Sequence, residues 1–151
     1  MSITLALIPL ALLLKVALCD KDFKDYVKKD LKVNECIILP TNFTNKEILL
    51  KTLNEYGITP ICRENDDIVC NIDGCALSFS KEEMNYIIEI KNISMHEDLY
   101  EHFLNIDCEY KKNVQEYTYL KTVQNLKEKQ ITIESEEIME DNSIVLTINL
   151  E

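Results

Sequence analysis

The cysteines offer the most varied chemistry in this sequence, because a thiolate can bind a metal, act as a nucleophile or form a disulfide. The chain has six of them. Cys70 and Cys75 are separated by four residues, a spacing found in some zinc sites, and Cys36 and Cys62 could join them. However, the C-x-x-C pairs that indicate zinc strongly are missing, and unpaired cysteine is often buried as a small hydrophobe. We therefore treat these four thiols as weak candidates for a metal or redox site.

The relation of Cys62 to Cys70 depends on the loop between the two strands expected to carry them. A three-residue loop would make the two residues a cross-strand pair. A loop of two or four residues would place Cys62 opposite Val69 and point the two thiols to opposite faces. The sequence leaves both arrangements open.

The only two histidines are six residues apart, at positions 96 and 102. On a helix, His96 and His102 would point about 120° away from each other, so they could not bind one ligand from a single face. Cys108 follows His102 by the same interval. No Ser/His/Asp or Cys/His arrangement is recognisable, so the sequence predicts no catalytic residue, no cofactor and no enzymatic activity.

Acidic and aromatic residues gather near the end of the chain. Five acids surround the last expected hairpin, and their spacing is not that of an EF-hand. One interpretation is a solvated acidic turn that discourages edge-to-edge strand pairing. The other is a surface that binds a protein partner. The candidate residues for such a surface are Glu136, Glu137, Glu140, Asp141, Tyr117 and Tyr119.

The charge of the chain limits its possible partners. It has 151 residues, a net charge of −11, 46% hydrophobic residues and 28% charged residues, a composition typical of a globular protein. Residues 1–35 carry a net charge of +1, so the remaining residues carry −12. Such an acidic body repels phosphate, and we therefore expect no nucleic-acid partner. The two glycines of the chain also exclude a glycine-rich nucleotide-binding loop.

The segment Ile3–Cys19 is almost entirely apolar, with only Thr4 and Lys15 interrupting it. It is near the minimum of about 17 residues for a spanning helix. We interpret residues 1–19 as a membrane anchor and 20–34 as a charged juxtamembrane linker or helix. The lysines that follow the segment would place the body in the cytoplasm. A cleaved signal, which would give a secreted domain with disulfides, and a buried helix or misassigned start are the alternatives.

The remaining chain alternates between helical and strand-like periodicity. We expect a single α+β domain over residues 35–151, with elements in the order β-α-β-β-β-β-α-β-β and a mixed or antiparallel sheet that has its helices on one face. The N-terminal hydrophobic helix would precede this domain. Thr44 or Asn45 is suited to cap the first helix of the domain and Gly57 to end it. The expected helices are 46–56 and 96–129, the second with a possible break near 107–112, and the expected strands are 35–40, 58–63, 68–72, 75–80, 86–93, 131–138 and 144–150.

The C-terminal part of the chain, residues 116–150, resembles the hypothetical chloroplast reading frame thirty-five family, a domain of unknown function. The matching positions are Tyr117, Tyr119 and Val123 in the helix, and Glu136, Glu137, Glu140, Asp141, Ser143 and Ile144 in the hairpin. The chain departs from the family where Gln130 and Asn142 replace glycines, although asparagine tolerates the left-handed conformation of a turn. The resemblance implies a fold and relatives, but no activity.

Together these observations predict a membrane-attached accessory or adaptor module without catalytic activity, whose acidic cytoplasmic surface binds a protein partner. The first alternative is a thiol-dependent metal-binding or redox protein that uses the four candidate cysteines. The second is a secreted domain with disulfides.

Overall fold

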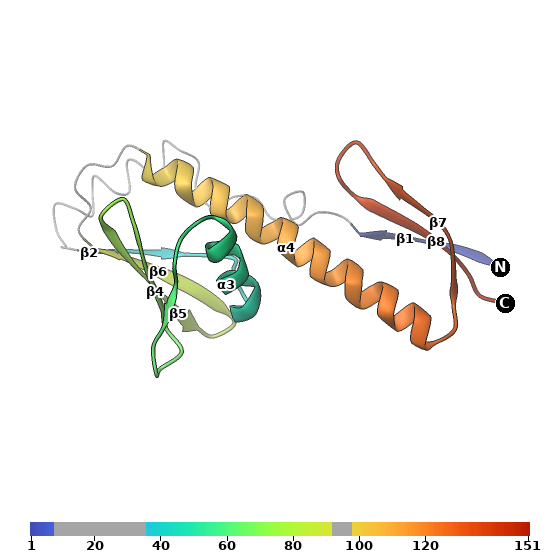
Figure 1. The fold of residues 1–151 in the computed structure, drawn as a ribbon, viewed down its shortest axis with the longest axis horizontal. Coiled ribbons are helices and arrows are strands. Elements are labelled where there is room, and N and C mark those ends of the chain that lie inside the picture. Colours follow the sequence, from blue (N-terminus) through green and yellow to red (C-terminus); the bar gives the residue numbers. More distant parts are fainter. Residues whose placement is uncertain (8–35, 92–97) are drawn as a thin grey trace. The chain divides into compact units, whose positions relative to one another are not determined.

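The computed structural model describes residues 1–7, 36–91 and 98–151 (Figure 1). The chain divides into two compact units. We call residues 16–110 the central unit and residues 1–15 together with 111–151 the terminal unit. The long helix α4, Leu99–Glu128, contributes its first residues to the central unit and the others to the terminal unit.

The central unit contains one helix of its own and a five-stranded antiparallel sheet in the order β2-β6-β5-β4-β3. Alternate residues of β6, namely Tyr86, Ile88 and Ile90, are buried, because successive side chains of a strand point to opposite faces. The ring of Phe43 lies 6.4 Å from that of Phe79 in the sheet and 4.5 Å from that of Tyr110 in α4. The elements are β2 (Cys36–Pro40), α3 (Lys46–Glu55), β3 (Ile61–Cys62), β4 (Ile68–Ile72), β5 (Cys75–Glu82) and β6 (Asn85–Lys91).

The helix α3 begins and ends as its sequence predicts. The side chain of Asn45 accepts a hydrogen bond from the backbone N–H of Ile48, at 3.0 Å, and so caps the first turn. Gly57 follows the helix with a φ of 89°, a conformation that glycine adopts at little cost. The hydroxyl of Tyr110 accepts hydrogen bonds from the N–H groups of Thr44 and Asn45, both at 3.0 Å.

The terminal unit contains a three-stranded antiparallel sheet in the order β1-β8-β7. Its strands are β1 (Ser2–Leu7), β7 (Thr132–Ile138) and β8 (Ile144–Asn149). Leu146 and Ile148 of the middle strand are buried together with Leu126 of α4, and Tyr119 and Val123 pack against this cluster. The sheet therefore buries one face against the second part of α4.

The α+β class and the predicted element order from residue 35 onward are confirmed, but two sheets replace the single one expected. Each unit has a sheet of its own, because Tyr110 in α4 packs on Phe43 of the central unit, whereas Leu126 packs on Leu146 of the terminal unit. The helix also continues without a break through residues 107–112.

The predicted N-terminal membrane helix, and with it the membrane localisation, is wrong. Residues Ser2–Leu7 form β1, which pairs with β8 from Ser2 opposite Asn149 to Leu7 opposite Ile144. Among the described residues, no helix is long and apolar enough to cross a membrane. The rest of the expected anchor and the expected linker, residues 8–34, lie outside the described residues.

Candidate functional site

The hairpin formed by β7 and β8 carries most of the predicted partner-binding residues, and its turn is held by local hydrogen bonds. Met139 donates its N–H to the carbonyl of Ser143, and Asn142 donates its N–H to the carbonyl of Met139, both at 2.9 Å. Asn142 has a φ of 63°, so the asparagine does adopt the left-handed conformation expected at this position. The turn is therefore well defined without glycine.

Asp141 belongs to the structure of this turn. Its Oδ1 accepts hydrogen bonds from the hydroxyl of Ser143 at 2.6 Å and from the N–H of Ser143 at 2.9 Å. These hydrogen bonds to the charged carboxylate lower the pKa of Asp141 below its ordinary value. The carboxylate of Asp141 therefore stabilises the turn of the hairpin.

Two contacts attach the hairpin to α4. The hydroxyl of Tyr119 donates to Oε2 of Glu136 at 2.8 Å, and this hydrogen bond raises the pKa of Tyr119. The amide of Gln115 donates to the carbonyls of Asn142 at 2.8 Å and Leu7 at 3.2 Å. Tyr119 and Glu136 thus contribute to the packing of the terminal unit.

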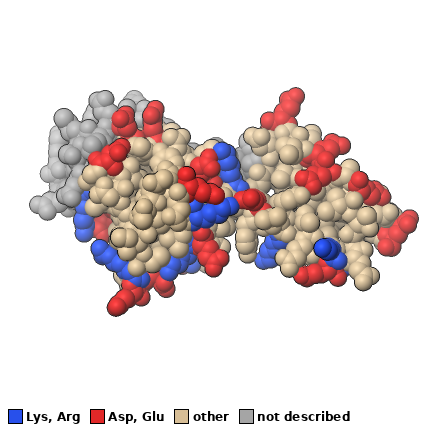
Figure 2. Space-filling view, viewed as in Figure 1, with Lys and Arg blue, Asp and Glu red and all other residues tan. Residues whose placement is uncertain are grey.

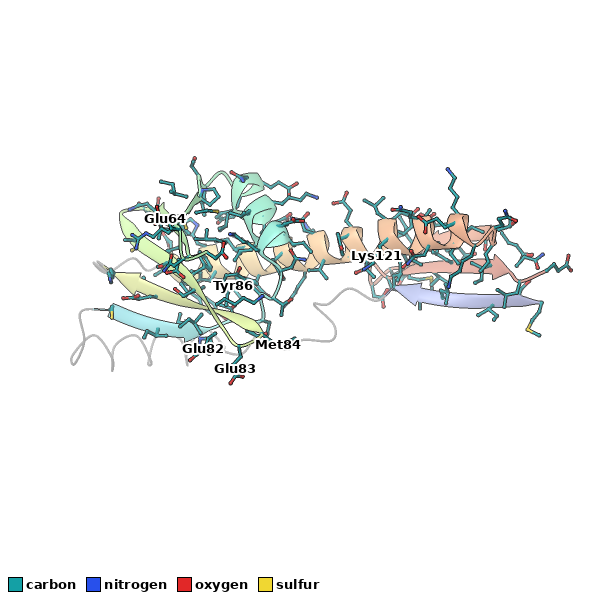
Figure 3. The ribbon with its side chains drawn as sticks, turned by 90° about the horizontal axis from the view of Figure 1, so that it is seen from below. Glu64, Glu82, Glu83, Met84, Tyr86 and Lys121 are labelled. Carbon is teal, nitrogen blue, oxygen red and sulfur yellow. The ribbon has the colours of Figure 1, made fainter. Side chains whose placement is uncertain are left out.

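The two tyrosines predicted to act together point in different directions. Residues two positions apart on a helix are separated by about 200°. Accordingly, Tyr119 packs against the sheet, whereas Tyr117 is 48% exposed. The ammonium group of Lys121 lies 5.9 Å from the centre of the Tyr117 ring, and Figure 3 shows Lys121 on the helix surface.

The outer part of the hairpin combines negative charge with exposed apolar side chains. Residues 132–149 include five acids and no lysine or arginine, and Figure 2 shows acidic side chains across the surface of the terminal unit. Ile138 and Met139 are 71% and 46% exposed. Beside them, the side chains of Glu137 and Glu140 form no hydrogen bond or ion pair with any described residue. We call Glu137, Ile138, Met139 and Glu140 the hairpin tip.

Sequence reasoning missed Ile138 and Met139 as candidate binding residues. The register shift between Ile133 and Ser135 places Ile138 opposite Ile144, on the face that carries Leu146, whereas simple alternation from Ile133 would put it on the other face. Ile144 does pack against the apolar cluster of the unit, but Ile138 is exposed at the end of its strand. The apolar residues adjoining an acidic turn are the signal that could have indicated this surface.

The four candidate cysteines do not converge on one site. Cys36 is opposite Lys91, so it lies on the face of the sheet that alternates with the buried Ile90. Cys70 is opposite Leu77, and Cys75 is opposite Ile72, so both belong to the buried face. Because of this alternation, Cys36 is on the opposite side of the sheet from the other two.

The register of Cys62 follows neither arrangement expected from the loop. Cys62 is opposite Ile68, and Arg63 donates its N–H to the carbonyl of Asp67 at 2.8 Å, which closes the loop. Cys62 and Cys70 therefore share a face, but they are offset by two residues.

The electrostatic environment also disfavours thiolate chemistry in the core. Burial raises the pKa of Cys70 to about 11. The pKa of Cys75 is raised by burial and by the nearby charge of Asp73. Within the described ranges, no three His, Cys, Asp or Glu side chains are grouped so that they could hold a metal.

A hydrogen-bonded chain of Tyr56, His102 and Asp73 is the second group of polar side chains that the fold assembles. The hydroxyl of Tyr56 is 2.7 Å from Nδ1 of His102, and Nε2 of His102 is 2.9 Å from Oδ2 of Asp73. Both ring nitrogens are therefore occupied, and neither is available to a metal. His96, the other histidine, lies outside the described residues. These hydrogen bonds connect the end of α3, the β4–β5 turn and α4 within the central unit.

A hollow of about 320 Å³ lies beside the turn that joins β5 and β6. Its lining includes Thr41, Glu82, Glu83 and Tyr86, and Figure 3 shows Glu82, Glu83 and Met84 around this turn. The hydroxyl of Thr41 already donates to the carbonyl of Tyr86 at 2.6 Å. The hollow thus offers two exposed carboxylates but no combination of acid, base and nucleophile.

Comparisons with protein-family models, with curated proteins and with solved structures found no match to the chain. The resemblance of residues 116–150 to the hypothetical chloroplast reading frame thirty-five family stays a prediction. Function must therefore be argued from the geometry of the chain itself.

Proposed function

We propose that this protein is a non-catalytic interaction module that binds a protein partner through the hairpin tip. The observation that carries the proposal is the exposure of Ile138 and Met139 between Glu137 and Glu140. Large apolar side chains exposed beside charges are characteristic of interaction sites, in which the apolar groups supply affinity and the charges supply steering.

The contacts below the tip prepare it for binding. Asp141 and Ser143 fix the turn, and Tyr119 holds β7 through Glu136. A surface that is ordered before association loses less conformational entropy on binding. These residues therefore support the binding surface, while the tip makes the contacts with the partner.

The chemistry of the tip indicates the kind of partner. Its acids favour lysine and arginine side chains, and its apolar pair favours aliphatic or aromatic ones. We infer a protein segment in which one or two apolar residues are flanked by basic residues. Added salt should weaken this association, because it screens the attraction between the charges.

A matched pair of variants tests the proposal in the full-length chain. The test variant combines Glu137→Lys with Ile138→Asp at the hairpin tip. The control variant combines Glu82→Lys with Met84→Asp, because the β5–β6 turn of the central unit also exposes two glutamates and a methionine. Each protein, carrying an identical photo-crosslinker, is incubated with extract from its native source, and crosslinked proteins are quantified by mass spectrometry.

The expected result is a salt-sensitive partner that the wild-type chain and the control capture equally, and that the tip variant captures at least about tenfold less. Equal capture by the tip variant and the wild type would refute the proposal. So would the lack of any partner that depends on the tip.

A further inference from the structure

The two edges of the sheet in the terminal unit differ in charge. The edge strand β7 carries Glu134, Glu136 and Glu137, and such charges discourage pairing with another strand. The other edge strand, β1, has the sequence SITLAL and no charged side chain. Among the described residues β1 pairs with β8 alone, and Ser2, Ile3, Thr4 and Ala6 are exposed. The β1 edge therefore lacks the protection that the β7 edge has.

The register with β8 shows which backbone groups of β1 point outward. Leu150 donates its N–H to the carbonyl of Met1 at 3.0 Å, so Met1 and Leu150 form a hydrogen-bonded pair. In an antiparallel ladder such pairs alternate with non-bonded ones. Ile3, Leu5 and Leu7 therefore bond to β8. The N–H and C=O groups of Ser2, Thr4 and Ala6 point away from it.

We propose that β1 pairs in antiparallel fashion with β1 of a second copy of this chain, in a register centred on Thr4. Thr4 is then opposite Thr4, and Ser2 is opposite Ala6. Every outward N–H and C=O group of the three residues gains a partner.

The side chains agree with the same register. Leu5 is opposite Leu146 and packs against the apolar cluster, so Ile3 and Leu5 are on the face covered by α4. Pairing through Thr4 places Ile3 of one copy opposite Leu5 of the other, which covers Ile3, now 39% exposed. It also places the two Thr4 side chains side by side on the other face, a favourable pairing. The two three-stranded sheets become one continuous sheet.

The strand β1 carries no charged side chain of its own, and the carboxylate that reaches it, that of Glu134, already accepts a hydrogen bond from the Ser2 hydroxyl at 2.9 Å. A second copy therefore fits this edge better than a strand of opposite charge. Two copies with a net charge of −11 each repel one another, and salt screens that repulsion. Salt should therefore strengthen the dimer and weaken binding at the hairpin tip. The two proposals can fail independently of each other. A single pair of short strands is smaller than a standard interface, so we expect dissociation in the micromolar range or above.

Sedimentation velocity of the full-length chain over a concentration series, at low and high salt, tests the dimer. Thr4→Lys places two positive charges directly opposite each other, and we expect it to raise the dissociation constant at least about tenfold. Ser135→Lys is the control, because Ser135 is exposed on the β7 edge and is opposite Thr147, which is itself opposite Thr4. The control should dimerise like the wild type.

Amide exchange followed by NMR gives a second measurement that does not depend on a variant. The N–H of Thr4 should become protected as the concentration rises, whereas that of Leu5, already bonded to β8, should not change. A chain that is monomeric at all concentrations and salt conditions would overturn the proposal. A dimer that Thr4→Lys leaves intact, or Thr4 exchange independent of concentration, would do the same.

Discussion

Replacing Tyr110 by phenylalanine tests the link between α4 and the start of α3. The Tyr110 hydroxyl accepts hydrogen bonds from the N–H groups of Thr44 and Asn45, both at 3.0 Å, while its ring packs against that of Phe43 in a tilted contact with the ring centres 4.5 Å apart. Tyr110 itself is buried, with an exposure of 3%. Tyr110→Phe removes one oxygen atom and leaves the ring contact in place.

The size of the effect follows from the two lost hydrogen bonds. Each contributes about 0.5–1.5 kcal/mol net, so the free energy of unfolding should fall by about 1–3 kcal/mol. The substitution creates no large cavity, so no further loss from repacking is expected. Because the N–H groups of Thr44 and Asn45 precede α3, the start of this helix should open first.

Equilibrium unfolding in urea measures the loss of stability, which corresponds to a shift of the midpoint by roughly 1 M. Amide exchange of Thr44 and Asn45 shows whether the loss is local. Tyr117→Phe is the control, because Tyr117 is exposed and its hydroxyl bonds to no described residue. A change of less than about 0.5 kcal/mol for Tyr110→Phe, or equal effects of the two variants, would refute this account of the contact.

Three further predictions concern the thiols and the turns. At pH 8, iodoacetamide should modify the exposed Cys62 of the native protein well before Cys70, and mass spectrometry measures this order of labelling. The reason is that a pKa of about 11 in place of 9.0 leaves Cys70 with about a hundredfold less thiolate. The pKa of Asp141 is depressed, so its contribution to the free energy of unfolding should be complete above pH 3.8 and should disappear as the pH falls through its folded-state pKa. Asp141→Asn should remove this pH dependence of stability. An NMR titration of the wild type should show the depressed pKa of the carboxyl. Glu83→Gly should raise the free energy of unfolding by about 1 kcal/mol in a urea titration, because Glu83 has a φ of 54°.

Each of these predictions has a contrary result. Labelling of Cys70 at the rate of Cys62 would contradict the burial argument. An Asp141 carboxyl that titrates at its ordinary value would mean that the hydrogen bonds from Ser143 do not hold in solution. For Glu83, the control is Glu82→Gly, which should destabilise because Glu82 is the last residue of a strand. Destabilisation by both substitutions would contradict the strain at Glu83.

Much of the fold could be predicted because the signals are local. The alternation of Tyr86, Ile88 and Ile90 predicts a strand with one buried face, and the structure buries these three residues. Asn45 caps α3 as expected from its side-chain chemistry. At the N-terminus the same reasoning failed, because an almost entirely apolar run does not distinguish a helix from a strand. Pairing of Ser2–Leu7 with β8, far along the chain, decides that these residues form a strand.

The candidate site was predictable only in part. The acidic character of the last hairpin is evident from the sequence, whereas the roles of its residues are not. Asp141 bonds to Ser143, and Glu136 bonds to Tyr119, so these two acids support the hairpin while Glu137 and Glu140 flank its exposed apolar residues. Which carboxylate meets a hydroxyl depends on the strand register and on the rotation of α4, and no local pattern specifies either.

The sequence by itself determined the α+β class, the order of elements from residue 35 and the acidic character of the chain, because periodicity, caps and charge are properties of neighbouring residues. Only the tertiary structure decided that there are two sheets, that Cys36 faces away from Cys70, and that Tyr56, His102 and Asp73 meet. These features require residues distant in sequence to come together, and a shift of one residue in a strand moves every side chain to the other face.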